Sequence, residues 1–376
     1  MVKRHPVIVT ALFLFLMSAP FLGADITTTV KITSYSVLYR LADESFSLAS
    51  FSLANMDFKS KGVSNVKGEL EVNSLVSDRL VLDVSRAYLK VRFPWFDLTA
   101  GKSRLSWGEG FAFNAGDVLF ESMSPVLDLS GSVLHDQTAP LAAVTSHFGN
   151  FTFLELVGLP GTFTTEFPPG SGLFIPTGID VTTLSGGGRF STRIADLFCE
   201  AGYLYRGGAK SHNPYLSFHG VLFDFIDFYL AGTCSIAQDN PEAEAIKESV
   251  KASFGLFKSF DLGVEQSFTF RVEAALYPFA AWEEPESPSP ATEYALYLFP
   301  EIALALPEKV GIQLRSLISP VAGCGVILGG VTWNPIQGFN AGLLLSCMFG
   351  DNSDLYGWGR ERDLALILNL EYLFGG

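Results

Sequence analysis

Basic side chains fall at alternating positions along two neighbouring segments of the sequence. Arg86, Lys90 and Arg92 share one phase of the first segment, and Lys102 and Arg104 lie two residues apart on the second. If both segments are β-strands joined by a turn at 94–97, these five cations converge on one wall. In a water-filled pore, such a wall attracts anions and selects against cations.

The residues that follow offer a different role for the same charges. Glu109 and Asp117 could pair with the cations in an internal salt-bridge network that leaves a pore unselective. Gly108 and Gly110 permit a tight inward bend, because glycine adopts conformations that larger residues resist. Trp107 would anchor the loop at its root. The sequence alone leaves the selective and the structural hypothesis open.

Alternating apolar and polar residues predict the strands that must position these groups. Between residues 363 and 374 every even position is apolar, whereas Asp363, Asn369 and Glu371 fall at odd positions. The segments 67–72 and 85–93 repeat this pattern. Period-two alternation with an apolar outer face and a polar inner face is typical of a transmembrane β-barrel.

The connections between strands alternate in length. Short turns are predicted at 59–62, 94–97, 149–150, 194–196, 224–226, 258–261, 307–309 and 334–337, and longer loops at 106–138, 158–179, 207–213, 238–246, 281–292 and 350–361. If the chain starts in the periplasm, the short turns fall on that side and the long loops outside, as in bacterial barrels. We therefore predict an all-β fold over residues 25–376, a closed antiparallel transmembrane barrel of about 18 strands, within a range of about 14 to 18.

The first 24 residues have the layout of a secretory signal peptide. Lys3 and Arg4 precede an uncharged apolar run over 7–17, and small residues precede Asp25. The apolar run is shorter than the roughly 20 residues that a spanning helix needs. We therefore expect export of the chain and exclude residues 1–24 from the fold.

Composition supports a membrane barrel. Hydrophobic residues make up 48% of the chain and charged residues 17%, and phenylalanine occurs 33 times. The longest uncharged stretch, 316–350, is broken by prolines and glycines into strand-sized pieces. Closed barrels are the alternative to helices for satisfying backbone polar groups in lipid. The net charge of −14 argues against nucleic acid as a partner.

One run of motifs resembles a known group of proteins. It comprises the stretches 86–89 and 101–110 followed by Asn114, Asp117 and Ser124-Pro125. The run is similar to a strand and inward loop in the alginate-export and phosphate-selective porin-like superfamily of Gram-negative outer-membrane barrels. There a Gly-Arg-Gln-Arg strand precedes a Trp-Gly-x-Gly turn; here Lys102 and Ser103 replace the first arginine and the glutamine. The resemblance implies a porin whose loop 106–138 enters the lumen.

The sequence argues against an enzyme. Its five histidines lie outside recognisable hydrolase motifs, and no phosphate-binding glycine loop or cluster of metal ligands is present, so we predict neither cofactor nor metal. Cys199, Cys234, Cys324 and Cys347 show no Cys-x-x-Cys spacing, which leaves one disulfide or four free thiols as alternatives.

We therefore expect an outer-membrane channel that passes small solutes, with a preference for anions. A transporter of hydrophobic molecules such as fatty acids is the alternative, suggested by the phenylalanine content and by apolar residues of the loop 158–179. A structural or adhesin barrel is a third. Expected partners are outer-membrane lipid and the barrel-assembly machinery, for which Tyr372 and Phe374 form a C-terminal signal. The oligomeric state stays open.

Overall fold

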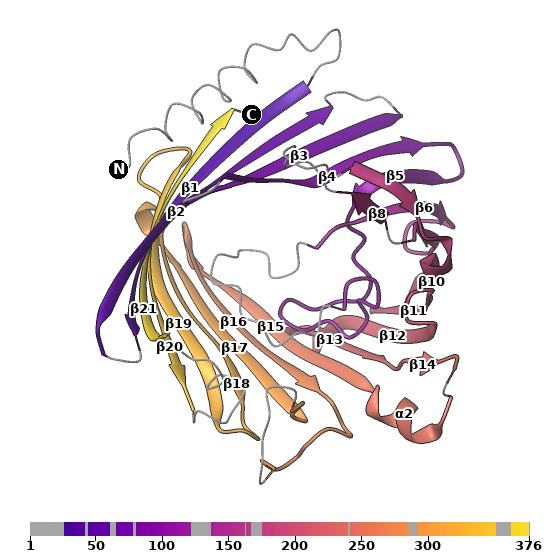
Figure 1. Ribbon diagram of the computed structural model, residues 1–376. Helices are drawn as coiled ribbons and strands as arrows, with labels where there is room; N and C mark the ends of the chain where they lie inside the picture. Colours follow the sequence, from indigo (N-terminus) through magenta and orange to yellow (C-terminus); the bar gives the residue numbers. More distant parts are fainter. Residues whose placement is uncertain are drawn as a thin grey trace.

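Eighteen antiparallel strands close into one barrel in the computed structural model (Figure 1). The structure describes residues 26–41, 44–60, 65–77, 80–121, 137–161, 163–166, 175–239, 241–285, 292–350 and 362–375. The barrel strands are β1 (Ile26–Leu41), β2 (Phe46–Ser60), β3 (Val66–Val76), β4 (Leu80–Arg92), β5 (Asp97–Ser103), β6 (Ala139–His147), β7 (Phe153–Leu159), β10 (Ser185–Ile194), β11 (Leu197–Arg206), β12 (Ser211–Leu222), β13 (Ile226–Thr233), β15 (Lys251–Gly263), β16 (Gln266–Leu276), β17 (Leu296–Leu306), β18 (Val310–Ser319), β19 (Cys324–Trp333), β20 (Phe339–Phe349) and β21 (Arg362–Gly375). The predicted fold class is confirmed.

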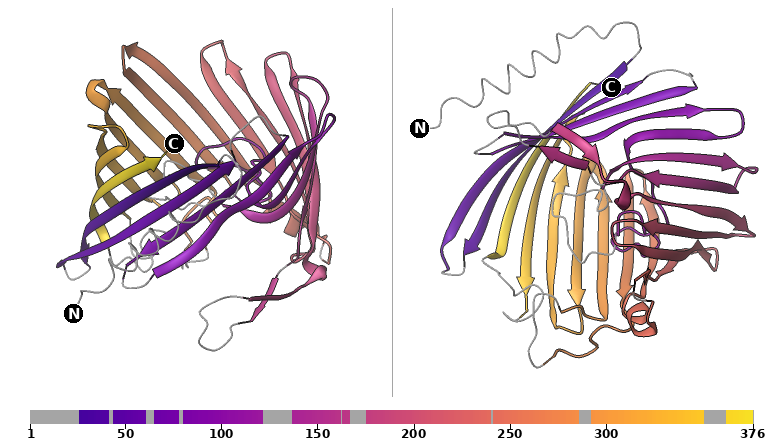
Figure 2. Two further views of the ribbon diagram at one scale, coloured as in Figure 1. Left: turned by 90° about the horizontal axis from the view of Figure 1, so that it is seen from above. Right: turned by 45° about the vertical axis from the view of Figure 1, so that its right-hand side comes forward.

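Each barrel strand pairs with the barrel strands before and after it in the chain. The first and last strands close the ring, with Val37 of β1 opposite Ile367 of β21. Strand β14 (Ile236–Ala237) pairs with β12 beside β13, and helix α2 (Ala243–Glu248) follows it. Strands β8 (Phe163–Glu166) and β9 (Ile175–Ile179) form a separate hairpin, which projects from the barrel in the left view of Figure 2.

The two faces of the strands follow the predicted alternation. On β21 the even positions Leu366, Leu368 and Leu370 are about 40% exposed, while Ile367 between them is 4% exposed. The leucines face outward, where lipid would cover them, and the odd positions face the lumen. None of the helices that the structure describes is both long and apolar enough to cross a bilayer.

Most predicted turns coincide with turns of the structure. The turn predicted at 59–62 overlaps the end of β2 and otherwise lies outside the described residues. Among the other short turns the exception is 258–261, where β15 continues to Gly263 and the turn is made by Val264 and Glu265. The prediction was wrong because Lys258 and Asp261 are charges near the strand end and not turn residues. Glu265 has a positive φ of 59°, which the tight reversal requires.

The opposite end of the barrel carries loops of more varied length than predicted. Strand β12 begins at Ser211, so the loop expected at 207–213 is a four-residue turn at 207–210. Short connections between β1 and β2, β3 and β4, and β18 and β19 were not predicted. The predicted signal peptide, 1–24, lies outside the described residues. Of the predicted lumen loop, 106–138, the structure describes 106–121 and 137–138.

Candidate functional site

The chain turns into the lumen after β5. Residues 104–121, which we call the inward loop, lie inside the barrel against the wall formed by the strands around β10 to β16 (Figure 1). Irregular backbone inside a barrel needs hydrogen-bond partners, because the strands have already used their own groups in the sheet. The wall provides those partners through a small set of charged side chains.

Trp107 sits at the root of the inward loop and is 0% exposed. Its Nε1 donates to Oε1 of Glu155 on β7 at 2.7 Å. Its ring stacks on Tyr215 of β12 at 5.7 Å between centroids. The indole therefore packs against an aromatic ring and donates to a carboxylate, as a fully buried tryptophan requires.

Gly108 makes the bend that follows. Its φ is +67°, and a Cβ there would lie 2.6 Å from Asn114 Oδ1 and 2.7 Å from the Cα of Gly116. Its backbone N–H donates to Glu200 Oε1 at 2.7 Å. Both the conformation and the close approach of the chain to itself require glycine here.

Glu273 of β16 holds the next turn and is also 0% exposed. Its carboxylate accepts from the backbone N–H groups of Phe111, Ala112 and Phe113 at 3.2, 2.7 and 3.0 Å. Arg271 lies 3.6 Å from the same carboxylate, and its guanidinium lies 3.7 Å from the centre of the Phe111 ring. One buried carboxylate thus binds three consecutive amides of the loop.

Two apolar clusters complete the seat of the loop. Trp107, Val118 and Leu119 pack against inward side chains of β6, β7, β11 and β12. Ala112, Phe113 and Ala115 pack against inward side chains of β13 and β16 to β19. The inward loop is therefore bound across a broad part of the wall, with apolar and polar contacts interleaved.

Asp117 and Arg206 order the last described turn of the loop. Asp117 is 2% exposed, and its carboxylate accepts from the N–H of Phe120 at 3.3 Å. Arg206 of β11 donates to the carbonyl of Val118 at 2.7 Å and lies 3.1 Å from Glu121. Asp117 is therefore a structural residue of the loop itself.

A cavity lies on either side of the inward loop. One of about 350 Å³ faces the short-turn end and is lined by Glu109, Phe111, His219, Asp227 and Arg271. The other, of about 330 Å³, faces the opposite end and is lined by residues that include Asp117, Arg206 and Lys251. The loop therefore lies between two cavities on this side of the lumen.

Three of the five predicted wall cations share a face that points into the lumen. Arg86 lies 3.4 Å from Glu69 and 3.3 Å from Glu71 of β3. Lys90 and Arg92 lie 2.9 and 3.5 Å from Asp97 of β5. These cations are neutralised by carboxylates of neighbouring strands.

The other two cations do not join this wall. The register pairs Lys102 with Ala87, so Lys102 lies on the opposite face of the sheet from Arg86. It lies 3.5 Å from Asp83 and donates to the carbonyl of Val84 at 2.5 Å. Strand β5 ends at Ser103, so Arg104 belongs to the inward loop, and no described residue forms an ion pair with it. A single wall of five cations was therefore a wrong prediction, because odd and even positions of paired strands were mixed.

Glu109 lies beside His219 of β12, with 3.7 Å between Oε1 and Nδ1. Among the described residues, the ionic partner of Glu109 is this histidine and not a predicted wall cation, so the pairing predicted for Glu109 was wrong. Loss of hydration among the crowded protein atoms of the lumen raises the pKa of the Glu109 carboxyl from its ordinary value of 4.5, and His219 opposes this shift.

The residues that hold the loop were missed by sequence reasoning. They are Glu155, Arg189, Glu200, Arg206, Arg271 and Glu273. Each is a charged residue at an inward-facing position of its strand, among mostly apolar or small neighbours. A charge at such a position was the signal in the sequence that could have identified them. The partners across the lumen cannot be deduced without the barrel.

Two further predictions concern the cysteines and the last strand. All four cysteines are in the described part of the chain and are free thiols. Tyr372 and Phe374 lie on the outward face of β21 with ring centroids 4.3 Å apart. Recognition of these rings by an assembly machinery stays a prediction.

Solved structures share this fold, although no family model and no curated protein matches the sequence. OccAB4 of Acinetobacter baumannii is 8% identical with a TM-score of 0.56, over 95% of this chain and 100% of that chain. The outer membrane protein opdK of Pseudomonas aeruginosa is 11% identical with a TM-score of 0.55, over 94% and 100%. OccK2 (OpdF) of Pseudomonas aeruginosa, in complex with glucuronate, is 10% identical with a TM-score of 0.57, over 93% and 98%. At these identities the likeness establishes the barrel fold.

Proposed function

We propose that the chain is an outer-membrane channel through which small solutes diffuse, with the inward loop as its constriction. The observation that carries this proposal is the set of hydrogen bonds that hold the inward loop. Glu155, Glu200 and Glu273 accept these bonds and so fix irregular backbone inside a closed barrel. A structural barrel has no need for such a partition. The fold shared with an outer membrane protein and with a barrel in complex with glucuronate supports a small organic solute.

Weak charge selectivity goes with this function. The lumen-facing cations Arg86, Lys90 and Arg92 each lie within 3.5 Å of a carboxylate. Paired charges create little net field, so we propose that the anion preference expected from the sequence is small. The inward loop would set the bore, and paired wall charges would keep the lumen hydrated.

The second candidate is a transporter of hydrophobic molecules. A lumen-facing apolar surface on β1, β2, β20 and β21 favours it. The apolar loop residues that first suggested it, Phe167, Leu173 and Phe174, lie outside the described residues, as do the side chains of Phe163 and Ile175.

Single-channel recording on the refolded full-length protein in planar bilayers tests the proposal. We expect stable conducting steps whose reversal potential in a salt gradient stays near zero. A barrel that inserts and shifts its electrophoretic mobility on heating, yet conducts no ions, would overturn the channel proposal and favour the hydrophobic transporter.

A further inference from the structure

The lumen wall changes character on β1, β2 and β21. Inward positions of these strands are polar toward the short-turn end, where Lys31 lies 3.0 Å from Glu371 and Asn55 donates to Asn73 at 2.7 Å. Further along the same inward rows the residues become apolar. The change from polar to apolar residues occurs at the same level on neighbouring strands. Tyr35 of β1 lies opposite Phe51 of β2, and Val37 of β1 lies opposite Ile367 of β21.

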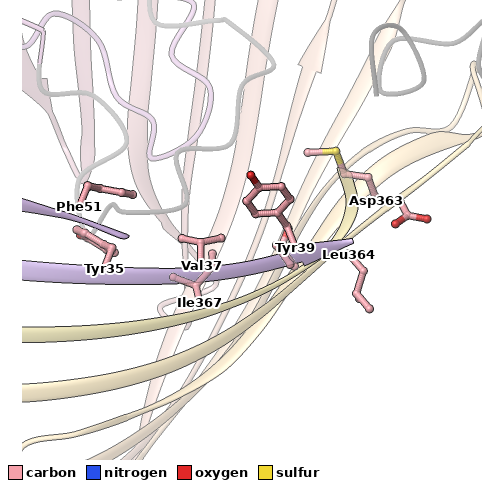
Figure 3. Close-up of a pocket in the computed structure, with 10 residues that line it drawn as sticks. Tyr35, Val37, Tyr39, Phe51, Asp363, Leu364 and Ile367 are labelled. Atoms are coloured by element: carbon pink, nitrogen blue, oxygen red, sulfur yellow. The ribbon is translucent and has the colours of Figure 1, made fainter. Parts of the chain in front are cut away.

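These apolar residues surround a pocket of about 330 Å³ in the lumen wall (Figure 3). The rings of Tyr35 and Phe51 stack at 4.9 Å between centroids with 22° between their planes. Val37 and Ile367 continue the apolar lining, and Met348 of β20 completes it. The volume lies within the range of about 300–1,000 Å³ that small-molecule sites occupy.

One end of the pocket is polar, and its carboxylate, Asp363, pairs with Arg40 outside the lining. Asp363 accepts from Arg40 Nε at 3.0 Å, and a second contact joins Arg40 Nη2 to the other carboxylate oxygen. Tyr39 and Ser346 lie nearby in the lining. Because the guanidinium and the carboxylate neutralise each other, this end offers hydrogen bonds to an uncharged polar group and little attraction to an ion.

Inward faces of such barrels are ordinarily polar, so an apolar pocket in the lumen wall is a departure from the usual pattern. A concave, mostly apolar lining with a few polar groups at one end is the usual form of a small-molecule site. We propose that this pocket binds the apolar ring of an amphipathic, uncharged solute whose polar part meets Asp363, Tyr39 and Ser346. The inference rests on the proposed channel function and names the class of solute that the channel would retain.

Phenyl β-D-glucopyranoside and methyl β-D-glucopyranoside are matched probes for this site. They share an uncharged sugar and differ in the ring that would stack on Tyr35 and Phe51. Isothermal titration of the folded barrel in detergent measures binding whether or not the protein conducts. We expect the phenyl glucoside to bind about tenfold or more tightly than the methyl glucoside, as burial of an aromatic ring provides. In bilayers it should block the current, and the methyl glucoside should not.

Phe51→Thr is the decisive variant, because threonine keeps the β propensity while removing the ring. It should weaken phenyl glucoside binding about tenfold. Leu53→Thr is the control, since Leu53 packs beside Phe51 on the same inward row of β2 but does not line the pocket. It should bind as the unsubstituted protein does, with mobility shifts on heating showing that both variants fold.

Equal affinity for the two glucosides would overturn the proposed binding pocket, and so would an equal loss of phenyl glucoside affinity in both variants. Neither result would contradict a conducting channel. Binding without conductance would support the pocket and overturn the channel proposal instead.

Discussion

Two parts of the lumen wall use carboxylates in different ways. On β7, β11 and β16, Glu155, Glu200 and Glu273 accept from groups of the inward loop. On β3 and β5, Glu69, Glu71 and Asp97 pair with cations of β4. The residue types are the same, but the partners of the first set are distant in sequence and those of the second are adjacent strands.

This difference separates positioning from electrostatics. A carboxylate that caps buried amides fixes the conformation of the loop, and its loss leaves donors without partners. A carboxylate that pairs with a half-exposed cation mainly adjusts the local charge of the wall. We therefore expect substitutions at Glu155, Glu200 or Glu273 to change how often the inward loop undocks and the channel opens wider. Substitutions among the carboxylates that pair with cations of β4 should change the ion selectivity.

The largest effect is expected for Glu273→Gln. The amide side chain cannot accept from the N–H groups of Phe111, Ala112 and Phe113 at once. Arg271 loses one of its two carboxylate partners and keeps Glu301 at 2.7 Å. Removing one partner of a buried charged network costs about 3 kcal/mol. Single-channel recording should show the larger, undocked state about 100-fold more often. Unchanged opening would mean that the carboxylate does not hold the loop.

A smaller effect is expected for Gly108→Ala. The new Cβ would sit at φ +67° and within 2.7 Å of Gly116, and left-handed backbone with such contacts costs about 2 kcal/mol. Opening should again become more frequent in recordings. Gly149→Ala is the control, because Gly149 has φ +98° in a turn with open space around its Cβ. If both variants open alike, the bend at Gly108 has no special role.

Glu71→Gln addresses the other wall. Glu71 lies 3.3 Å from Arg86, which keeps Glu69 as a second partner, so we expect a loss in stability of about 1 kcal/mol. The reversal potential in a salt gradient should shift slightly toward anions, and the frequency of opening should match that of the unsubstituted protein. Opening like that of Glu273→Gln would erase the distinction between the walls.

The sequence predicted the barrel better than the site. Alternation such as that of Leu366 and Ile367 is local, so the strands, the faces and the entry of the chain into the lumen after β5 could be expected. Whether Lys102 shares a face with Arg86 depends on the register between two strands, which one residue of offset reverses. The contact between Glu273 and Ala112 spans 161 positions and exists only after closure of the ring.

The smallest effect is expected for the pH dependence that Glu109 gives to docking of the inward loop. Its carboxyl has a pKa raised above 4.5 by loss of hydration in the docked loop. The docked state therefore binds the proton more tightly than an undocked loop. The free energy by which protonated Glu109 favours the docked loop is fully present below the ordinary pKa of a glutamate. It is lost as pH rises through the raised pKa.

Opening should accordingly become more frequent as pH rises across that window, by less than in Glu273→Gln or Gly108→Ala. Recording at a series of pH values measures this, and Glu109→Gln should remove the dependence while keeping the loop docked. His219, 3.7 Å from Glu109, opposes the upward shift in the pKa of the Glu109 carboxyl. Rising closure with rising pH would therefore identify deprotonation of Glu109 as a docking step and overturn this account of the loop.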